Sequence, residues 1–169
     1  MAGESESSLL EVTKALPKGA DEARGQETLA DLRAALVGSD WQGMAETEAF
    51  GTLAASLAGN SPFIARTCLR YPELLPFIAS VSPSKGFETS LNEVTAAGTG
   101  ASTFDELMSI VRRAKSEMAV RTSAADVSGL WSLEDVTENL TRFADTILEA
   151  GFTWLLQRAS EKGDIVGDA

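Results

Sequence analysis

The feature that most constrains the fold is the helical spacing of apolar residues between clusters of proline and glycine. In the intervals 27–37 and 42–57, apolar side chains recur every three or four positions, which places them on one face of a helix. Ser61 and Pro62 predict a helix start, because serine can accept a hydrogen bond from a free backbone N–H and proline suits a first turn. No alternating run of β-branched residues competes with this pattern. The sequence therefore predicts an all-α fold.

Two further helix starts predict long helices in the second half. In a capping box, a serine or threonine side chain bonds the backbone N–H three residues on, and an acidic side chain there bonds back. The matching pairs are Thr103 with Glu106 and Ser132 with Asp135. We expect helices over 103–127 and 132–159, with a shorter one over 87–97 and a flexible linker at 98–102. The predicted architecture is a multi-helix bundle of about six or seven helices, the last two long.

Length and patterning predict one folded domain between two less ordered ends. A chain of 169 residues is long enough for one hydrophobic core. Residues 1–25 are polar and weakly patterned, so we expect a weakly ordered N-terminal segment there. The helical domain is expected over 26–160, and a flexible tail over 161–169.

The composition excludes several classes of catalytic and metal site. Histidine is absent and cysteine occurs once, so neither a Ser-His-Asp nor a Cys-His nucleophile can be assembled. The same counts exclude a zinc site with histidine or paired cysteine ligands, and a disulfide within the chain. Any metal would need the oxygen ligands that magnesium, calcium and manganese prefer. We expect Cys68 to be a small buried hydrophobe.

Charge and hydropathy narrow the possible partners. With 14 Lys+Arg against 25 Asp+Glu, the formal net charge is −11, which argues against nucleic acid as a partner. No apolar stretch is long enough to span a membrane, and the N-terminus lacks the pattern of a secretory signal. Together with the single cysteine, these features predict a cytoplasmic protein with no membrane partner.

Two groups of residues could bind an anion. The turn 59–63 is either an anion-binding helix start or a capped helix corner, and the corner is the simpler interpretation. Arg112, Arg113 and Lys115 could face a phosphate. The alternative is a solvated face on which Arg113 pairs with Glu117, and both interpretations stay open.

A group of acidic residues near the start of the last predicted helix could bind a metal. Asp135 and Glu138 lie one turn apart and could share an ion. Acidic side chains in a first turn are explained more simply by the helix dipole. The full group is Glu134, Asp135, Glu138 and Asp145. Nothing in the sequence assembles a nucleophile, a base and an electrophile, so no catalytic, cofactor-binding or metal-binding residue is assigned.

Two parts of the sequence together resemble a known family. SPFIAR at 61–66 is followed by LRYPELL at 69–75, and VRRAK at 111–115 by AADVSGLWSLEDVT at 124–137 and LTRFAD at 140–145. In order and spacing these segments are similar to the bifunctional glutamine synthetase adenylyltransferase/adenylyl-removing enzymes, over roughly residues 28–158. The signature positions, to which no role is assigned, are Ser61, Pro62, Arg66, Pro72, Arg112, Arg113 and Asp126.

The resemblance implies a helical region that leads into a catalytic unit. Members carry, soon after this point, a glycine-serine segment and an Asp-x-Asp pair that holds magnesium against nucleotide phosphates. Asp164 and Asp168 do not reproduce that pair, so the catalytic nucleotidyltransferase domain is expected to be absent. Magnesium and ATP are therefore implied for the full-length family only, and this chain alone is predicted to be inactive.

The same resemblance implies a role and partners. The chain would support the missing nucleotidyltransferase domain and help position glutamine synthetase, from which that half of the enzyme removes AMP, in the regulation of nitrogen assimilation. A PII-type signal protein is the other partner implied. The alternative is a self-standing all-α interaction protein with no enzymatic activity.

An exposed apolar patch on the last helix would mark the surface that meets the missing domain. Phe152 and Trp154 point about 200° apart at ~100° per residue, so one of them must face away from the core. We expect the patch around these residues and Leu155. In the alternative, residues 1–25 fold back and cover it. The residues assigned to the helix's repeat are Leu133, Val136, Leu140, Phe143, Ile147, Leu148 and Leu155.

Overall fold

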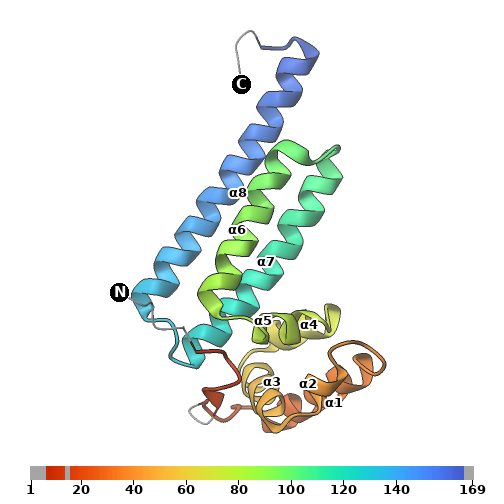
Figure 1. Cartoon of the computed structure of the whole chain (residues 1–169), viewed down its shortest axis with the longest axis vertical. Coiled ribbons are helices and arrows are strands. Elements are labelled where there is room, and N and C mark those ends of the chain that lie inside the picture. The colour runs from red at the N-terminus through yellow and green to blue at the C-terminus, as the bar shows by residue number, and fades with distance from the viewer. Residues whose placement is uncertain (1–6, 14–15, 166–169) are drawn as a thin grey trace.

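The computed structural model describes residues 7–13 and 16–165, and these contain eight helices and no strand (Figure 1). Five short helices come first: α1 Glu22–Ala35, α2 Gln42–Ala45, α3 Glu48–Asn60, α4 Pro62–Arg70 and α5 Leu74–Ala79. Three longer ones follow: α6 Pro83–Gly100, α7 Phe104–Val127 and α8 Leu133–Lys162. The predicted all-α class with two long final helices is confirmed.

The helix count is slightly higher than predicted because the expected helix over 42–57 is divided into α2 and α3. Thr47 lies between the two in an extended conformation. Its hydroxyl donates to the Met44 carbonyl at 2.8 Å and accepts from the Phe50 N–H at 3.2 Å. One threonine therefore ends the first helix and caps the second.

The helices form two parts (Figure 1). α1 to α5 gather at one end around an N-terminal core that includes Leu32, Phe50, Leu53 and Ile78. α6, α7 and α8 run side by side as a layer, with α6 in the middle. The layer core contains Phe87, Leu91, Val94, Met118, Trp131 and Phe143.

α7 belongs to both parts. Val120 and Ala124 are members of the N-terminal core, whereas Ala114 and Met118 are members of the layer core. Outside the cores, Arg113 on α7 donates to Glu73 in the turn before α5, at 3.1 Å. The two parts therefore share α7, and this fixes the orientation of the layer relative to the N-terminal core.

The first turn of α1 is bound to the end of α3. The Arg24 guanidinium donates to the carbonyls of Ala58 at 2.9 Å and Gly59 at 2.6 Å, which α3 leaves free at its C-terminus. α1 approaches α3 closely here, since a Cβ on Gly25 would lie 2.6 Å from the Ala55 carbonyl oxygen. Glycine at position 25 is what permits this approach.

A buried ion pair within α7 is hydrogen-bonded to α6. Arg121 is fully buried and its Nη2 donates to Oε1 of Glu117 at 2.6 Å. The same oxygen accepts from the Ser90 hydroxyl, also at 2.6 Å. Nε and Nη1 of Arg121 have no hydrogen-bond partner among the described residues. A Cβ on Gly86 would overlap the guanidinium, so the arginine occupies space that only glycine leaves free.

The flexible linker expected at 98–102 is mostly helical, because α6 continues to Gly100. Gly98 lies against α8, where an added Cβ would come 2.8 Å from the Cα atom of Ala150. The glycine that suggested flexibility instead allows two helices to pack closely.

Replacement of Ser61 by alanine is expected to destabilise the chain. The Ser61 Oγ accepts from the Ile64 N–H at 3.3 Å at the start of α4. Loss of this cap should lower the free energy of unfolding by about 0.5–2 kcal/mol, measured by urea denaturation. Thr89→Ala is the control, because Thr89 is exposed within α6 and caps nothing. Equal stability of the two variants would contradict the assigned cap.

Replacement of Gly86 by alanine should lower stability, whereas the same substitution at an open helix position should raise it. The methyl group would displace the buried Arg121 guanidinium, and overpacking of this kind lowers stability by about 1–3 kcal/mol. Gly151→Ala is the matched control, since a Cβ there meets nothing within 4 Å. It should raise stability by about 0.5–1 kcal/mol through helix propensity. If thermal unfolding shows that the melting temperature of both variants shifts in the same direction, this assignment is refuted.

Candidate functional site

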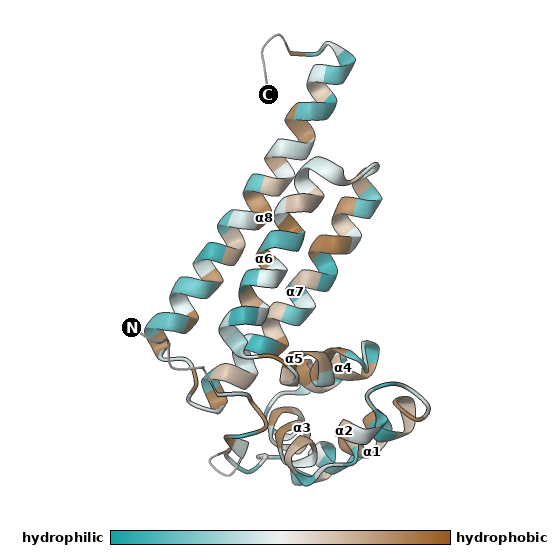
Figure 2. Ribbon diagram, in the orientation of Figure 1, coloured by the Kyte–Doolittle hydropathy of each residue, from teal (hydrophilic) through white to brown (hydrophobic). Residues whose placement is uncertain are grey.

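Helix α8 is long but scarcely buried. Of its 30 residues, only Phe143 and Ala150 are buried. Figure 2 shows apolar residues recurring along α8, including the part that extends beyond α6 and α7. Most helices in globular proteins are stabilised by packing an apolar face, so the outer side of α8 is the first candidate for an interaction surface.

The first turn of α8 is fixed by a capping box. The Ser132 hydroxyl accepts from the Asp135 N–H at 3.1 Å, and the Asp135 carboxylate accepts from the Ser132 N–H at 2.8 Å. Hydrogen bonds from the side chain and backbone of Ser132 lower the pKa of Asp135. The predicted cap is confirmed, and Asp135 is engaged in structure.

Aromatic and charged contacts hold the same end of α8 against α6. Phe87 and Trp131 meet edge to face, with ring centroids 6.0 Å apart. The Arg142 guanidinium lies over the Phe87 ring and also donates to Glu88 at 2.8 Å. These contacts leave Arg142 pointing toward α6 and away from the outer side of the helix.

The far end of α8 is attached to the turn between α6 and α7. The Trp154 indole N–H donates to the Ala101 carbonyl at 2.8 Å, and Arg158 donates to the same carbonyl at 3.1 Å. Phe104 packs against Trp154, with ring centroids 5.8 Å apart. α8 is therefore held at two places about four turns apart and cannot turn freely about its axis.

An apolar stripe remains exposed along the outer side of α8. Phe152 is 62% exposed, Leu148 59% and Leu155 52%. At ~100° per residue the stripe fills an arc of about 120°, centred roughly 130° from the buried pair Phe143 and Ala150. Its members are Leu133, Leu140, Ala144, Leu148, Phe152 and Leu155, all of them exposed.

The expected patch is confirmed in part. Phe152 and Leu155 are exposed, whereas Trp154 is half-buried against Ala101 and Phe104. Leu133, Leu140 and Leu148, which the sequence pattern placed in the helix's apolar repeat, are all exposed. The angle of about 140° between Leu148 and Phe143 could have shown this for Leu148, whereas Leu140 and Leu133 lie only about 60° and 80° from Phe143.

The N-terminal segment does not supply the expected cover in its described part. Leu9 is completely buried in the N-terminal core, and Leu10 and Leu16 pack against the same cluster. Positions 1–6 and 14–15 lie outside the described residues. The stripe is thus open to solvent over the part of the chain that the structure describes.

Three of the signature positions shape the corner around α4. Ser61 caps the helix, Pro62 is its first residue, and Pro72 is half-buried in the turn that leads to α5. This geometry agrees with a capped helix corner at 59–63. Glycine and asparagine there also bind the chain before α1, since Asn60 accepts from the Ala20 N–H at 3.0 Å.

The four charged signature positions lie on the surface of α4 and α7. Arg66, Arg112 and Asp126 are exposed, and Arg113 is engaged by Glu73. The expected pairing of Arg113 with Glu117 is wrong, because Glu117 points into the layer and binds Arg121. The spacing along α7 allows Glu117 to pair with either Arg113 or Arg121. Tertiary packing, which buries Glu117 and Arg121 together, selects Arg121.

The acidic residues on α8 do not converge. Over residues 7–13 and 16–165, no group of three or more acidic, cysteine or histidine side chains is arranged to hold a metal ion. Glu134, Glu138 and Asp145 are exposed on the helix surface. Cys68 is buried as expected, and burial raises the pKa of its thiol to about 12, so the thiol stays protonated at neutral pH.

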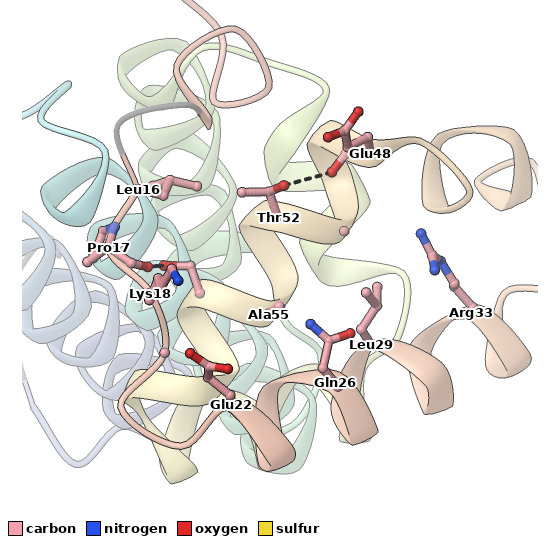
Figure 3. A pocket seen from close by; sticks show the side chains of 13 residues that line it. Leu16, Pro17, Lys18, Glu22, Gln26, Leu29, Arg33, Glu48, Thr52 and Ala55 are labelled. Atoms are coloured by element: carbon pink, nitrogen blue, oxygen red, sulfur yellow. Dashed lines mark hydrogen bonds between the residues drawn. The ribbon is translucent and has the colours of Figure 1, made fainter.

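A groove of about 430 Å³ lies between α1 and α3, which the sequence did not predict (Figure 3). Leu29 and Ala55 contribute apolar surface, and Lys18, Glu22 and Glu48 line its edges. The space exists because Gly51 has no side chain beside Leu29 and Arg33. Its mixed charges select no particular ligand chemistry.

Comparisons with known proteins give the family. The family described as "Glutamate-ammonia ligase adenylyltransferase" matches residues 51–168. No solved structure matches the chain. Within the described ranges, no helix is both long and apolar enough to cross a membrane.

The curated relatives are much longer proteins that carry one name, "Bifunctional glutamine synthetase adenylyltransferase/adenylyl-removing enzyme". The protein from Brucella suis is 34% identical over 106 residues, which are 62% of this chain and 11% of that protein. The protein from Rhodopseudomonas palustris BisB5 is 28% identical over 145 residues, 86% of this chain and 15% of its own. The one from Caulobacter vibrioides is 30% identical over 122 residues, 71% of this chain and 12% of its own.

These matches agree with the resemblance carried by the two signature parts. The family match covers α4 to α8 and most of α3, and so includes both the capped corner and the exposed stripe. The chain belongs to the glutamate-ammonia ligase adenylyltransferase family.

Proposed function

We propose that this chain is a non-catalytic helical region of a glutamine synthetase adenylyltransferase/adenylyl-removing enzyme. It supports the nucleotidyltransferase domain and helps position glutamine synthetase, in a cytoplasmic system that regulates nitrogen assimilation. Glutamine synthetase enters the proposal through the name of the relatives, of which the chain spans 11–15% in the three proteins compared.

The observation that carries the proposal is the role of α7. Because α7 contributes to both cores, the N-terminal part and the three-helix layer are held in one arrangement. α8 is in turn attached at two places along its length. A support for a catalytic domain needs such stiffness, since small displacements of reacting groups greatly reduce rates.

The chemistry of AMP transfer is assigned to the rest of the enzyme. Phosphoryl chemistry of this kind needs a cation held by carboxylates against the phosphates. Magnesium and ATP therefore belong to the nucleotidyltransferase domain in this proposal. A PII-type signal protein is proposed as a partner of the full enzyme, and none of the surfaces described above is assigned to it.

The purified chain alone should neither transfer AMP to glutamine synthetase nor remove it. The assay would supply magnesium with ATP for transfer, and magnesium with inorganic phosphate for removal, and would follow radiolabelled AMP. No turnover is expected, because over residues 7–13 and 16–165 no group of three or more acidic, cysteine or histidine side chains is arranged to hold the cation. Magnesium-dependent release of AMP by the chain would overturn the proposal.

A full-length chimaera tests the supporting role directly. In the Brucella suis relative, the region that matches this chain is replaced by this chain, and a second version lacks the region altogether. The chimaera should retain AMP transfer to glutamine synthetase, whereas the deletion should lose at least tenfold in rate. A self-standing interaction protein would not restore activity, so an inactive but folded chimaera favours that alternative.

A further inference from the structure

The exposed stripe on α8 has the spacing of a surface that packs against another helix. Leu133, Leu140, Leu148 and Leu155 are seven, eight and seven positions apart, which keeps them aligned along the helix axis. From Leu133 to Leu155 the stripe runs about 33 Å at 1.5 Å per residue. A partner must therefore be long and straight to cover it, as a helix is.

Small residues allow close approach at the middle of the stripe. Ala144 lies within it, and Gly151 follows on the same side, where an added Cβ would meet nothing within 4 Å. On its opposite side α8 already packs closely through Ala150 and Gly98. The leucines and Phe152 would then act as knobs between the side chains of a partner helix.

The charges beside the stripe indicate which charge a partner helix should carry along one edge. Four exposed acidic residues follow the side of the stripe that faces away from α6: Glu134, Glu138, Asp145 and Glu149. No lysine or arginine lies among them, and Arg142 is engaged with Glu88. A partner helix with lysine or arginine along one edge would complement this row, as charges flanking a helix pair do.

The same charges disfavour a second copy of this chain. Two copies paired antiparallel through the stripe would place one acidic row against the other. Each chain also carries a formal net charge of −11, which opposes self-association. An occupant with a different charge pattern from this chain is therefore favoured over an antiparallel second copy.

We infer that the stripe on α8 binds an amphipathic helix, with a basic edge, from the rest of the family's polypeptide. The relatives contain six times or more the length that this chain matches, since the chain spans 11–15% of them. The family match continues along all of α8 to residue 168. A docked helix would convert the open layer of α6, α7 and α8 into a four-helix unit. The inference rests on the proposed function, because it assumes that this region lies within the longer enzyme.

Thiol labelling can test the inference because the chain has one cysteine and that cysteine is inert. Cys68 is buried and its thiol pKa is raised to about 12. Leu148→Cys and Phe152→Cys would each add one reactive thiol within the stripe, and Val37→Cys one at a site 67% exposed outside it. Labelling rates with a maleimide would be read peptide by peptide by mass spectrometry, in the chain alone and in the chimaera.

We expect the stripe to be protected from maleimide labelling in the chimaera and not in the chain alone. Both stripe thiols should label at least tenfold more slowly in the chimaera than in the chain alone, with Val37→Cys unchanged. Unchanged labelling of the stripe in the chimaera would refute the docked helix. Protection in the chain alone that increases with its concentration would instead assign the stripe to a second copy.

Charge reversal tests the basic edge separately. Adding Glu138→Lys and Glu149→Lys to the Leu148→Cys chimaera should restore faster labelling, whereas Glu93→Lys, on α6, should not. If the double reversal has no effect, the partner's basic edge is refuted.

AMP transfer by the same chimaera keeps the two proposals distinct. An active chimaera with an unprotected stripe refutes only the docked helix, and an inactive one with a protected stripe counts only against the supporting role.

Discussion

The arrangement of the helices depends on one buried cation, Arg121. An arginine out of water is tolerated only when its charge is matched, and Glu117 and Ser90 supply the match from α7 and α6. Gly86 supplies the space. The three together fix the position of α6 along α7, and Val120 and Ala124, on the same stretch of α7, complete the N-terminal core. A slip between α6 and α7 would therefore break the hydrogen bond from Ser90 to Glu117 and bring a residue larger than glycine against the buried guanidinium.

The sequence predicts the helices well wherever the information is local. Ser61, Thr103 and Ser132 each cap a helix within one residue of the predicted start, because a cap depends only on a few neighbouring residues. The break at Thr47 is also local, but the continuous apolar spacing across it obscured the cap. The prediction of a linker at 98–102 was wrong for a different reason. Gly98 serves contact with Ala150, which lies far along the chain and leaves no pattern nearby.

The candidate site shows the same division between local and distant information. The exposure of Phe152 follows from helix geometry, and so does the separation of Leu148 from Phe143, whereas the exposure of Leu133 and Leu140 depends on tertiary packing. The burial of Glu117 does not follow, since Arg113 and Arg121 are both four positions away and only packing selects between them. The groove between α1 and α3 likewise depends on where Gly51 meets α1. The periodicity of the sequence gives the faces of a helix, and tertiary packing determines which face is buried.

The sharing of α7 has a consequence for the order of folding during synthesis. Leu9 packs in the same core as Val120 and Ala124, so the part of the chain from Leu9 to α5 cannot complete its core until α7 has left the ribosome. At about 5–20 residues per second, that interval lasts for seconds. Contacts within α6 and α7 are closer in sequence and can form sooner. The nascent chain therefore passes through a stage in which the apolar residues of α1 to α5 await their last partner, and this stage is where chaperone binding would matter most.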